Sequence, residues 1–171
     1  MHVRNVHERH FAASPAEVGA LLDGLSSPAD RLWPRRWPRM RFDRPLVVGA
    51  GGGHGPIGYD IEAYESSRRI RFRLRRPRGF DGYHEFEVVP DRNGATLRHT
   101  LEMKARGVAI ITWPLVIAPL HDALIEDCLD SAASALNEAP HRKRWSPRVR
   151  FLRALFRIFT SSSRRTNPQS V

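Results

Sequence analysis

The chain has 171 residues, and 41% of them are apolar, including four Trp and eight Phe. This length suits one domain with a buried core, and the apolar content excludes a disordered chain. The single cysteine, Cys128, excludes an internal disulfide, so we expect a cytoplasmic protein. No leader pattern opens the sequence, and the longest apolar run, 108–120, holds two prolines and is shorter than the about 20 residues of a spanning helix. We therefore expect that run to be buried protein.

The net charge of +10 suggests a nucleic-acid-binding protein until the charges are placed along the chain. Nine of the 28 Lys and Arg residues lie in 139–171, which contains no acidic residue. Residues 1–138 contain the remaining 19 basic residues and 18 acidic residues, so the globular part is nearly neutral. The basic character belongs to the C-terminal tail, and nucleic acid is not the expected partner.

The first predicted elements are a strand over 2–11 and a short helix. Residues 14–17 read Ser-Pro-Ala-Glu, which gives a serine N-cap, a proline at the first helical position and a glutamate that completes a capping box. Two Trp-Pro pairs, at 33–34 and 37–38, mark an irregular segment whose tryptophans either pack beneath the loop or lie at a pocket mouth. A short strand over 46–48 and a glycine loop over 49–55 follow.

Apolar and polar residues then alternate four times between 59 and 103, which predicts four antiparallel strands joined by turns at 66–67, 77–82 and 91–94. The predicted partners are Ala63–Ile70, Ile61–Phe72 and Tyr59–Leu74, then Leu74–His84, Phe72–Phe86 and Ile70–Val88, then Val88–Leu97, Phe86–His99 and His84–Leu101. The same register aligns opposite charges on the other face, in the rows Asp60–Arg73–Glu85 and Glu62–Arg71–Glu87–Arg98.

A long helix is predicted from about the break at Trp113-Pro114 to Asn137, because apolar residues recur at spacings of three and four. Its predicted solvent side carries Asp122, Glu126, Asp127 and Asp130. The whole chain is then divided into a domain over 1–139, a basic linker over 140–146, an amphipathic basic helix over 147–160 and a disordered tail over 161–171.

This order of elements resembles the START-like helix-grip superfamily (SRPBCC), which includes polyketide cyclases. The residues that carry the likeness are 11–18, 33–34, 82–89 and 114–136. The resemblance implies an α+β fold in which a curved antiparallel sheet of six or seven strands wraps around a long C-terminal helix, here with an extra amphipathic tail helix. It also implies a cavity for an apolar small molecule, with no universal catalytic set and no cofactor.

The inward face of the predicted sheet is apolar except for Tyr59, His84 and His99, and His121 leans toward the same space from the helix. A few polar groups among apolar walls are how small-molecule pockets orient a ligand. The predicted ligand-binding residues are Tyr59, Ile61, Phe72, His84, Phe86, His99, Leu101, Met103, His121 and Leu124. The alternative for each histidine is a core residue satisfied by a carbonyl or by water.

Two chemical alternatives remain for these histidines. His84 or His99 acting as a general base would make the protein a cyclase, aromatase or dehydratase. A metal site formed by His84, His99 and His121 is disfavoured, because no acidic residue is predicted on the inward face to orient an imidazole. We therefore expect no metal. The glycine loop lacks the Lys-Ser/Thr pair of a phosphate-binding loop.

The tail helix places arginines on one side and large apolar residues on the other, as interfacial helices do. Three partners remain open for it: an anionic membrane surface, the protein's own domain, or a second copy in a homodimer. The predicted contact residues are Arg150, Phe151, Leu152, Arg153, Leu155, Phe156, Arg157 and Phe159.

The sequence thus predicts a cytoplasmic helix-grip protein that binds a hydrophobic small molecule or lipid, with a tail helix that attaches it to the inner membrane surface. The alternatives are an enzyme that uses His84 or His99, and a non-catalytic interaction module that dimerises or recruits a partner through the tail helix.

Overall fold

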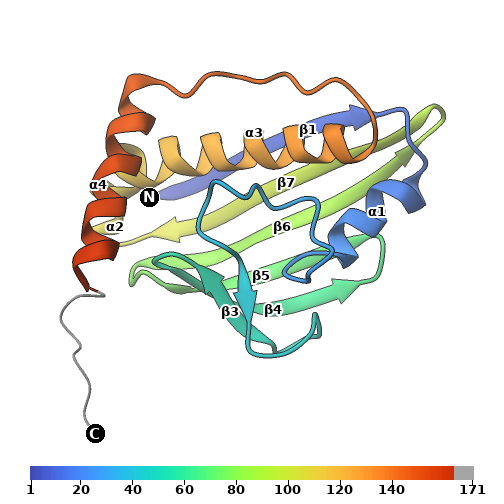
Figure 1. Ribbon diagram of the computed structural model, residues 1–171. Coiled ribbons are helices and arrows are strands. Elements are labelled where there is room, and N and C mark those ends of the chain that lie inside the picture. The colour runs from blue at the N-terminus through green and yellow to red at the C-terminus, as the bar shows by residue number, and fades with distance from the viewer. Residues whose placement is uncertain (164–171) are drawn as a thin grey trace, which may run out of the picture.

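The computed structural model describes residues 1–163, and the side chains of 1–156. In this part of the chain, seven strands form one antiparallel sheet in the order β1-β7-β6-β5-β4-β3-β2 (Figure 1). The strands are β1 (His2–Phe11), β2 (Arg41–Phe42), β3 (Gly51–His54), β4 (Ile57–Glu65), β5 (Arg69–Arg76), β6 (Phe80–Asp91) and β7 (Gly94–Ala105). The helices are α1 (Pro15–Asp23), α2 (Ala109–Thr112), the π-helical turn η1 (Trp113–Ile117), α3 (Ala118–Ala135) and α4 (Pro147–Ser163).

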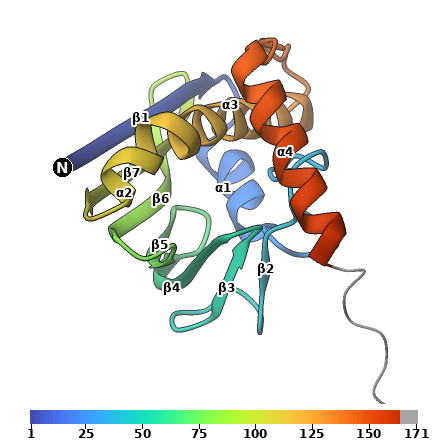
Figure 2. The same ribbon diagram turned by 90° about the vertical axis from the view of Figure 1, so that its left-hand side faces the viewer.

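The long helix formed by α2, η1 and α3 lies across one face of the sheet (Figure 1). Its buried residues, among them Leu124, Cys128 and Leu129, pack on the inward residues of the strands and form the main core with α1. The linker after α3 then runs back along it, so that α4 lies at the end of the molecule where α2 lies (Figures 1 and 2). The predicted α+β helix-grip architecture with an added tail helix is confirmed.

The predicted N-terminal elements are also confirmed. The strand β1 covers the expected residues, and the backbone N–H of Glu17 donates to Ser14 Oγ while the Glu17 carboxylate accepts from the Ser14 backbone N–H. This capping box satisfies N–H groups that the first turn of a helix leaves free. The apolar stripe of α1 is buried, with Val18 and Leu22 fully enclosed.

The register of β6 with β7 is as predicted, with Phe86 opposite His99. Between β4 and β5, two of the predicted pairs form, but Ala63 faces Arg71 instead of Ile70 because a bulge follows Ile61. Between β5 and β6 the predicted register is wrong by two residues, since β6 already begins at Phe80 and the connection is shorter than expected. A shift of two keeps every side chain on its face, so the inward face was predicted correctly.

The outer face of the sheet carries charge pairs, as predicted, and some of the partners differ from those predicted. Arg71 contacts Glu85 at 2.6 Å, because the shifted register brings them together, instead of lying in a row with Glu62 and Glu87. Arg73 lies opposite Asp60, as predicted, and its side chain contacts Glu62 at 2.8 Å. The predicted neighbours Glu87 and Arg98 lie 3.8 Å apart.

The predicted strand over 46–48 is wrong, and the glycine segment after it is itself the strand β3. Glycine is depleted in strands, which is why the sequence predicts a loop here. The backbone needs glycine because β2 approaches closely: a Cβ on Gly52 would lie 2.2 Å from the carbonyl oxygen of Arg41.

The predicted break at Trp113-Pro114 is wrong as well, since the helix begins at Ala109 and passes through these residues. The backbone N–H of Ala118 donates to the carbonyl of Trp113, five residues back, and this wider turn accommodates the proline. The predicted burial of 108–120 fails in part, because Val108 and Ile111 are exposed. By length and composition alone, Ala109–Ala135 is apolar enough to cross a membrane, a test that the core helix of a globular protein also passes.

Two predictions for the C-terminal region change. Asp127 lies buried instead of on the solvent side of the long helix, because aromatic side chains from the rest of the chain cover it. The helix α4 continues to Ser163, three residues beyond its predicted end. The rest of the predicted disordered tail, 164–171, lies outside the described residues.

Candidate ligand-binding site

A cavity of about 710 Å³ lies between the sheet and α3. Its walls are mainly apolar and aromatic, and its volume is in the range of small-molecule pockets. The strands contribute Leu74, Phe80, His84, Phe86, His99 and Leu101, and the long helix contributes Trp113, Ile117, Leu120, His121, Leu124 and Ile125. The loop between α1 and β2, the β3–β4 turn and α4 complete the wall.

Six of the ten predicted ligand-binding residues line this cavity: His84, Phe86, His99, Leu101, His121 and Leu124. The other four are buried but do not line it. Tyr59, Ile61 and Phe72 belong to the main core, and Met103 belongs to a second core cluster. The Phe72 ring stacks on the His84 ring and the Tyr59 ring meets it edge-on, with centroids 4.7 and 4.8 Å away, so both support the wall instead of forming it.

The histidines His84 and His99 form a buried pair. The Nδ1 atom of His84 lies 3.3 Å from Nε2 of His99, and the other nitrogen of each ring has no hydrogen-bond partner among the described residues. Burial lowers the pKa of both imidazoles well below the ordinary value, and the neighbouring histidines lower it further. Both rings are therefore neutral near pH 7, and each carries one N–H group.

This pair has a fixed hydrogen-bonding capacity. If one ring donates to the other, the donor ring keeps a free lone pair on its second nitrogen, and the acceptor ring keeps a free N–H. Either tautomer thus leaves one unfilled donor and one unfilled acceptor, on buried nitrogens of two rings that line the cavity. A neutral imidazole with a lowered pKa is a weak proton acceptor, and neither ring contacts a carboxylate among the described residues.

Several residues of the cavity were not predicted as ligand-binding residues. Trp33 and Trp37 lie in its wall, and the Trp33 indole N–H donates to the carbonyl of Pro38, which fixes the irregular loop. The His54 ring packs 4.8 Å from Trp33, and Nδ1 of His54 lies 3.0 Å from the Tyr59 hydroxyl. The Trp-Pro pairs were the available signal for this wall, but nothing in their spacing shows that they reach the sheet.

The helix α4 is held against the domain around one buried carboxylate. Asp127 accepts hydrogen bonds from the indole N–H groups of Trp37 at 2.7 Å and Trp145 at 3.1 Å, and it forms an ion pair with Arg36 at 2.8 Å. The guanidinium of Arg153 lies over both indole rings, 3.9 and 4.1 Å from their centroids. These contacts place α4 beside the cavity.

The tail residues divide between two environments. Arg153 and Phe156 line the cavity, and Leu152 is half-buried, so this side of α4 contacts the protein's own domain. Arg150, Phe151 and Leu155 are exposed. The predicted contact residues Arg157 and Phe159 lie outside the residues whose side chains are described. Only part of the apolar side of α4 is therefore buried against the domain, and the rest is exposed.

A second hollow, of about 840 Å³, lies between α3 and the basic linker. Its lining carries charges of both signs, and the linker backbone already uses one of them, since Asp130 accepts from the N–H groups of His141 and Arg142. The cavity beneath α3 is the better candidate, because its buried polar atoms remain unfilled.

No family model matches the sequence, and no curated protein sequence matches it. Solved structures are similar in fold. CalU16 from Micromonospora echinospora is 16% identical with a TM-score of 0.58 over 92% of this chain and 86% of that one. A protein from Thermobifida fusca is 20% identical with a TM-score of 0.60 over 83% and 99% of the two chains.

Norcoclaurine synthase from Thalictrum flavum, solved with dopamine and hydroxybenzaldehyde, is 15% identical with a TM-score of 0.59 over 84% of this chain and 90% of that one. Identities this low show the fold and not the activity. Together with the sheet order, the long helix and the cavity between them, these likenesses show that the chain has the START-like helix-grip fold.

Proposed function

We propose that the protein binds and carries a hydrophobic small molecule or lipid in the cavity between the sheet and α3. The observation that carries this proposal is a cavity of about 710 Å³ with apolar walls and two buried imidazoles, each with one nitrogen that lacks a partner among the described residues. Burial of apolar ligand surface supplies affinity, at about 25 cal/mol for each Å² removed from water. The fold likeness to a norcoclaurine synthase solved with small organic molecules supports a ligand of this kind.

The ligand has a polar end that meets the pair of His84 and His99. One unfilled donor and one unfilled acceptor are best matched by a group that both accepts and donates, such as a hydroxyl. A ligand without such a group leaves both nitrogens without a partner, which costs about 1–3 kcal/mol for each buried group. The bound molecule is therefore expected to be apolar with one hydroxyl-type end.

Native mass spectrometry of the purified full chain tests this proposal. We expect a mass above that of the polypeptide, and organic extraction should release a molecule with the polar end described above. In Leu124→Trp, the indole fills the cavity that Leu124 lines, so the extra mass should be lost. The matched control is Val48→Trp, which adds the same ring at an exposed position outside the cavity wall and should keep the ligand.

The proposal fails if the full chain and Leu124→Trp carry the same molecule, or if hydrophobic probes bind both equally. Circular dichroism of the variants shows whether they keep the fold. The extracted molecule also tests the enzymatic alternative. If it is converted by fresh protein, and His84→Phe abolishes that conversion, the cavity is a catalytic site; the lowered pKa of His84 supports carriage instead.

We further propose that the ligand is exchanged at an anionic membrane surface. Six large apolar side chains are exposed on the two helices at one end of the molecule: Val108, Ile110, Ile111, Leu115, Phe151 and Leu155. Figure 2 shows this end, with α2 on the left and α4 on the right. The cavity reaches it, because Trp113 and Ile117 on one side and Phe156 on the other belong to its wall.

The charges at this end favour a negatively charged surface. Arg148 donates to the carbonyls of Pro114 and Leu115, which bridges the two helices without neutralising its charge. Arg150, next to Phe151 in the sequence of α4, is exposed. Exposed apolar residues between arginines describe a membrane interface, where each basic residue contributes about 1 kcal/mol near an anionic bilayer. A second copy of the chain is a less favourable partner, because it would bring the same positively charged arginines together.

Flotation with phosphatidylcholine vesicles that contain phosphatidylglycerol tests this placement. The full chain should float with these vesicles, and the double variant Ile111→Asp/Leu115→Asp should lose at least about tenfold in partitioning. The control is Val47→Asp/Val48→Asp, which changes two equally exposed apolar residues elsewhere and should float normally. The membrane proposal is wrong if flotation of Ile111→Asp/Leu115→Asp is unchanged. If the wild type is a dimer by sedimentation and this variant is a monomer, the surface binds a second copy instead.

A further inference from the structure

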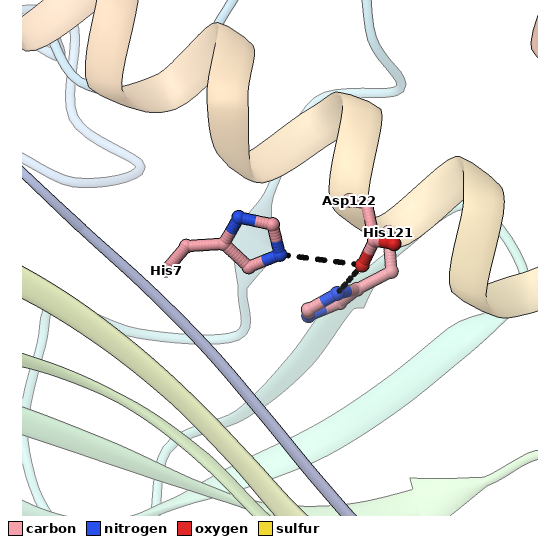
Figure 3. Close-up of side chains that lie close together, drawn as sticks. All are labelled: His7, His121 and Asp122. Atoms are coloured by element: carbon pink, nitrogen blue, oxygen red, sulfur yellow. Dashed lines mark hydrogen bonds and ion pairs between the residues drawn. The ribbon is translucent and has the colours of Figure 1, made fainter.

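Three metal-ligating side chains converge at the edge of the long helix, where the sequence predicts no metal. His7 comes from β1, and His121 and Asp122 come from the first turns of α3 (Figure 3). The Oδ1 atom of Asp122 lies 3.2 Å from Nε2 of His7 and 3.5 Å from Nδ1 of His121. The three ligand atoms lie within 4.8 Å of one another.

The two distances to Asp122 match the spacing of donor atoms around a transition metal. With bonds of about 2.1 Å, the donors of a tetrahedral zinc site are about 3.4 Å apart, and neighbouring donors of an octahedral site are about 3.0 Å apart. Two imidazoles and one carboxylate are also a sufficient ligand set, because open zinc and iron sites use three protein ligands and leave a position for water. Asp122 is 45% exposed, which leaves the site accessible to solvent.

A second layer of contacts orients the ligands. The other nitrogen of His7, Nδ1, lies 2.9 Å from the Glu126 carboxylate, which fixes the ring with Nε2 directed at Asp122. Arg9 in turn contacts Glu126 at 3.4 Å. The side-chain amide of Asn5 donates to Asp122 Oδ1 at 3.0 Å. A carboxylate behind a metal-bound histidine is the common arrangement in protein metal sites, since it holds the imidazole in the ligating tautomer.

An ion pair of His7 with two carboxylates would explain part of this cluster but not His121. The His121 ring is mostly enclosed, with 13% of its side chain exposed, and its contact with Asp122 is at the limit of a hydrogen bond. Its Nε2 atom is buried without a partner among the described residues. A shared metal ion accounts for the direction of Nδ1 toward Asp122, and it leaves Nε2 as the N–H of a ring that also lines the cavity.

We propose that His7, His121 and Asp122 form a binding site for a divalent transition metal ion of the zinc class. The site borders the ligand cavity, because His121 also lines the cavity wall and its ring lies 5.0 Å from that of His99. Coordination through Nδ1 places the remaining proton of His121 on Nε2. The metal therefore sets the hydrogen-bonding state of a cavity residue without entering the cavity. The site itself does not depend on the proposed ligand function.

The experiment uses the full chain, stripped with a chelator and then titrated with Co²⁺, whose absorption bands report the ligand field, and with Zn²⁺ in competition. We expect one equivalent to bind, and His7→Gln and Asp122→Asn to weaken binding at least about tenfold. His10→Gln is the control, because His10 lies on the same strand and pairs with Asp91 at 2.9 Å outside the cluster. Its affinity should equal that of the wild type.

Asp122→Asn keeps the shape of the side chain, so its circular dichroism and melting curve separate a lost ligand from a lost fold. A rise of the melting temperature with Zn²⁺ in the wild type and in His10→Gln, absent in Asp122→Asn, supports the site. The proposal is overturned if the stripped protein takes up neither ion, or if His7→Gln and Asp122→Asn bind both ions as the wild type does. Neither result bears on the ligand detected by native mass spectrometry.

Discussion

His84 and His99 lie among aromatic rings, and their surroundings decide what a polar ligand end meets in the cavity. The rings of Tyr59, Phe72 and His99 contact His84, and the histidines at 54 and 121 are the other titratable groups that act on it. None of these groups is an acid that would stabilise an imidazolium. Desolvation therefore dominates, and it keeps the pKa of His84 well below the ordinary value of 6.5.

This lowered pKa predicts acid destabilisation. The unfolded chain takes up a proton on His84 as the pH falls below about 6.5, whereas the folded chain does not, so the free energy of unfolding falls with pH. The slope approaches about 1.4 kcal/mol per pH unit for each such histidine. Urea unfolding between pH 7 and pH 5 measures it. The difference between wild type and His84→Phe should shrink toward acid pH, and a constant difference would show that His84 protonates equally in both states.

At the scale of elements, one buried carboxylate connects α3, the irregular loop and the linker before α4. We expect Asp127→Asn to lower the free energy of unfolding by about 3 kcal/mol, because an amide nitrogen then faces the donors of Trp37 or Arg36. Chemical denaturation measures this effect. Asp81→Asn is the control, since its ion pair with Arg106 is exposed on both sides and should contribute less than about 1 kcal/mol. Equal effects of the two changes would contradict the role of Asp127.

The position of α4 also predicts how the cavity exchanges its contents. Phe156 lines the cavity, whereas its neighbour Leu155 is 39% exposed. Removing the Phe156 ring widens the mouth without touching the sheet, so Phe156→Ala should speed the release of a bound hydrophobic dye about tenfold or more. Stopped-flow fluorescence measures the release rate. Leu155→Ala should leave it unchanged, and if both variants release the dye alike, α4 does not control the mouth.

How much the sequence predicts depends on how local the signal is. The strand β1, the capping box at Ser14 and the pairing of β6 with β7 follow from periodicity and turn residues within a few positions, and all three are confirmed. The inward face of the sheet also follows, because parity survives a register error of two residues. These signals suffice for the fold and for the histidine pair.

The rest of the candidate site depends on contacts between distant segments. The strand β3 consists mainly of glycines, because the close approach of Arg41 leaves no room for a side chain. In the sequence, the same glycines predict a loop. Asp127 has the spacing of a solvent-facing residue until Trp37 and Trp145 cover it. His7 reaches α3 only because β1 is the strand at that edge of the sheet. No local pattern carries such information.

At the scale of the whole molecule, the basic tail and the exposed apolar side chains lie at the same end. The nearly neutral region 1–138 forms the sheet, α1 and the long helix, and the excess of nine basic residues follows it. The described part of this tail returns to the end of the molecule where the exposed residues of α2 and η1 lie (Figure 2). A bilayer is wide enough to contact both helices at once, with the cavity mouth between them.

The proposed contact with an anionic membrane predicts a free energy of binding with two separable parts. Raising sodium chloride from about 0.05 M to about 0.5 M shortens the screening length from above 10 Å to a few Å, so it should remove the attraction of the exposed arginines to anionic vesicles. The apolar contacts persist in salt. Flotation of the wild type should therefore fall with salt to a residual level, which Ile111→Asp/Leu115→Asp abolishes and Arg148→Gln/Arg150→Gln leaves in place. Binding that vanishes completely in salt would show that the exposed apolar residues do not enter the bilayer.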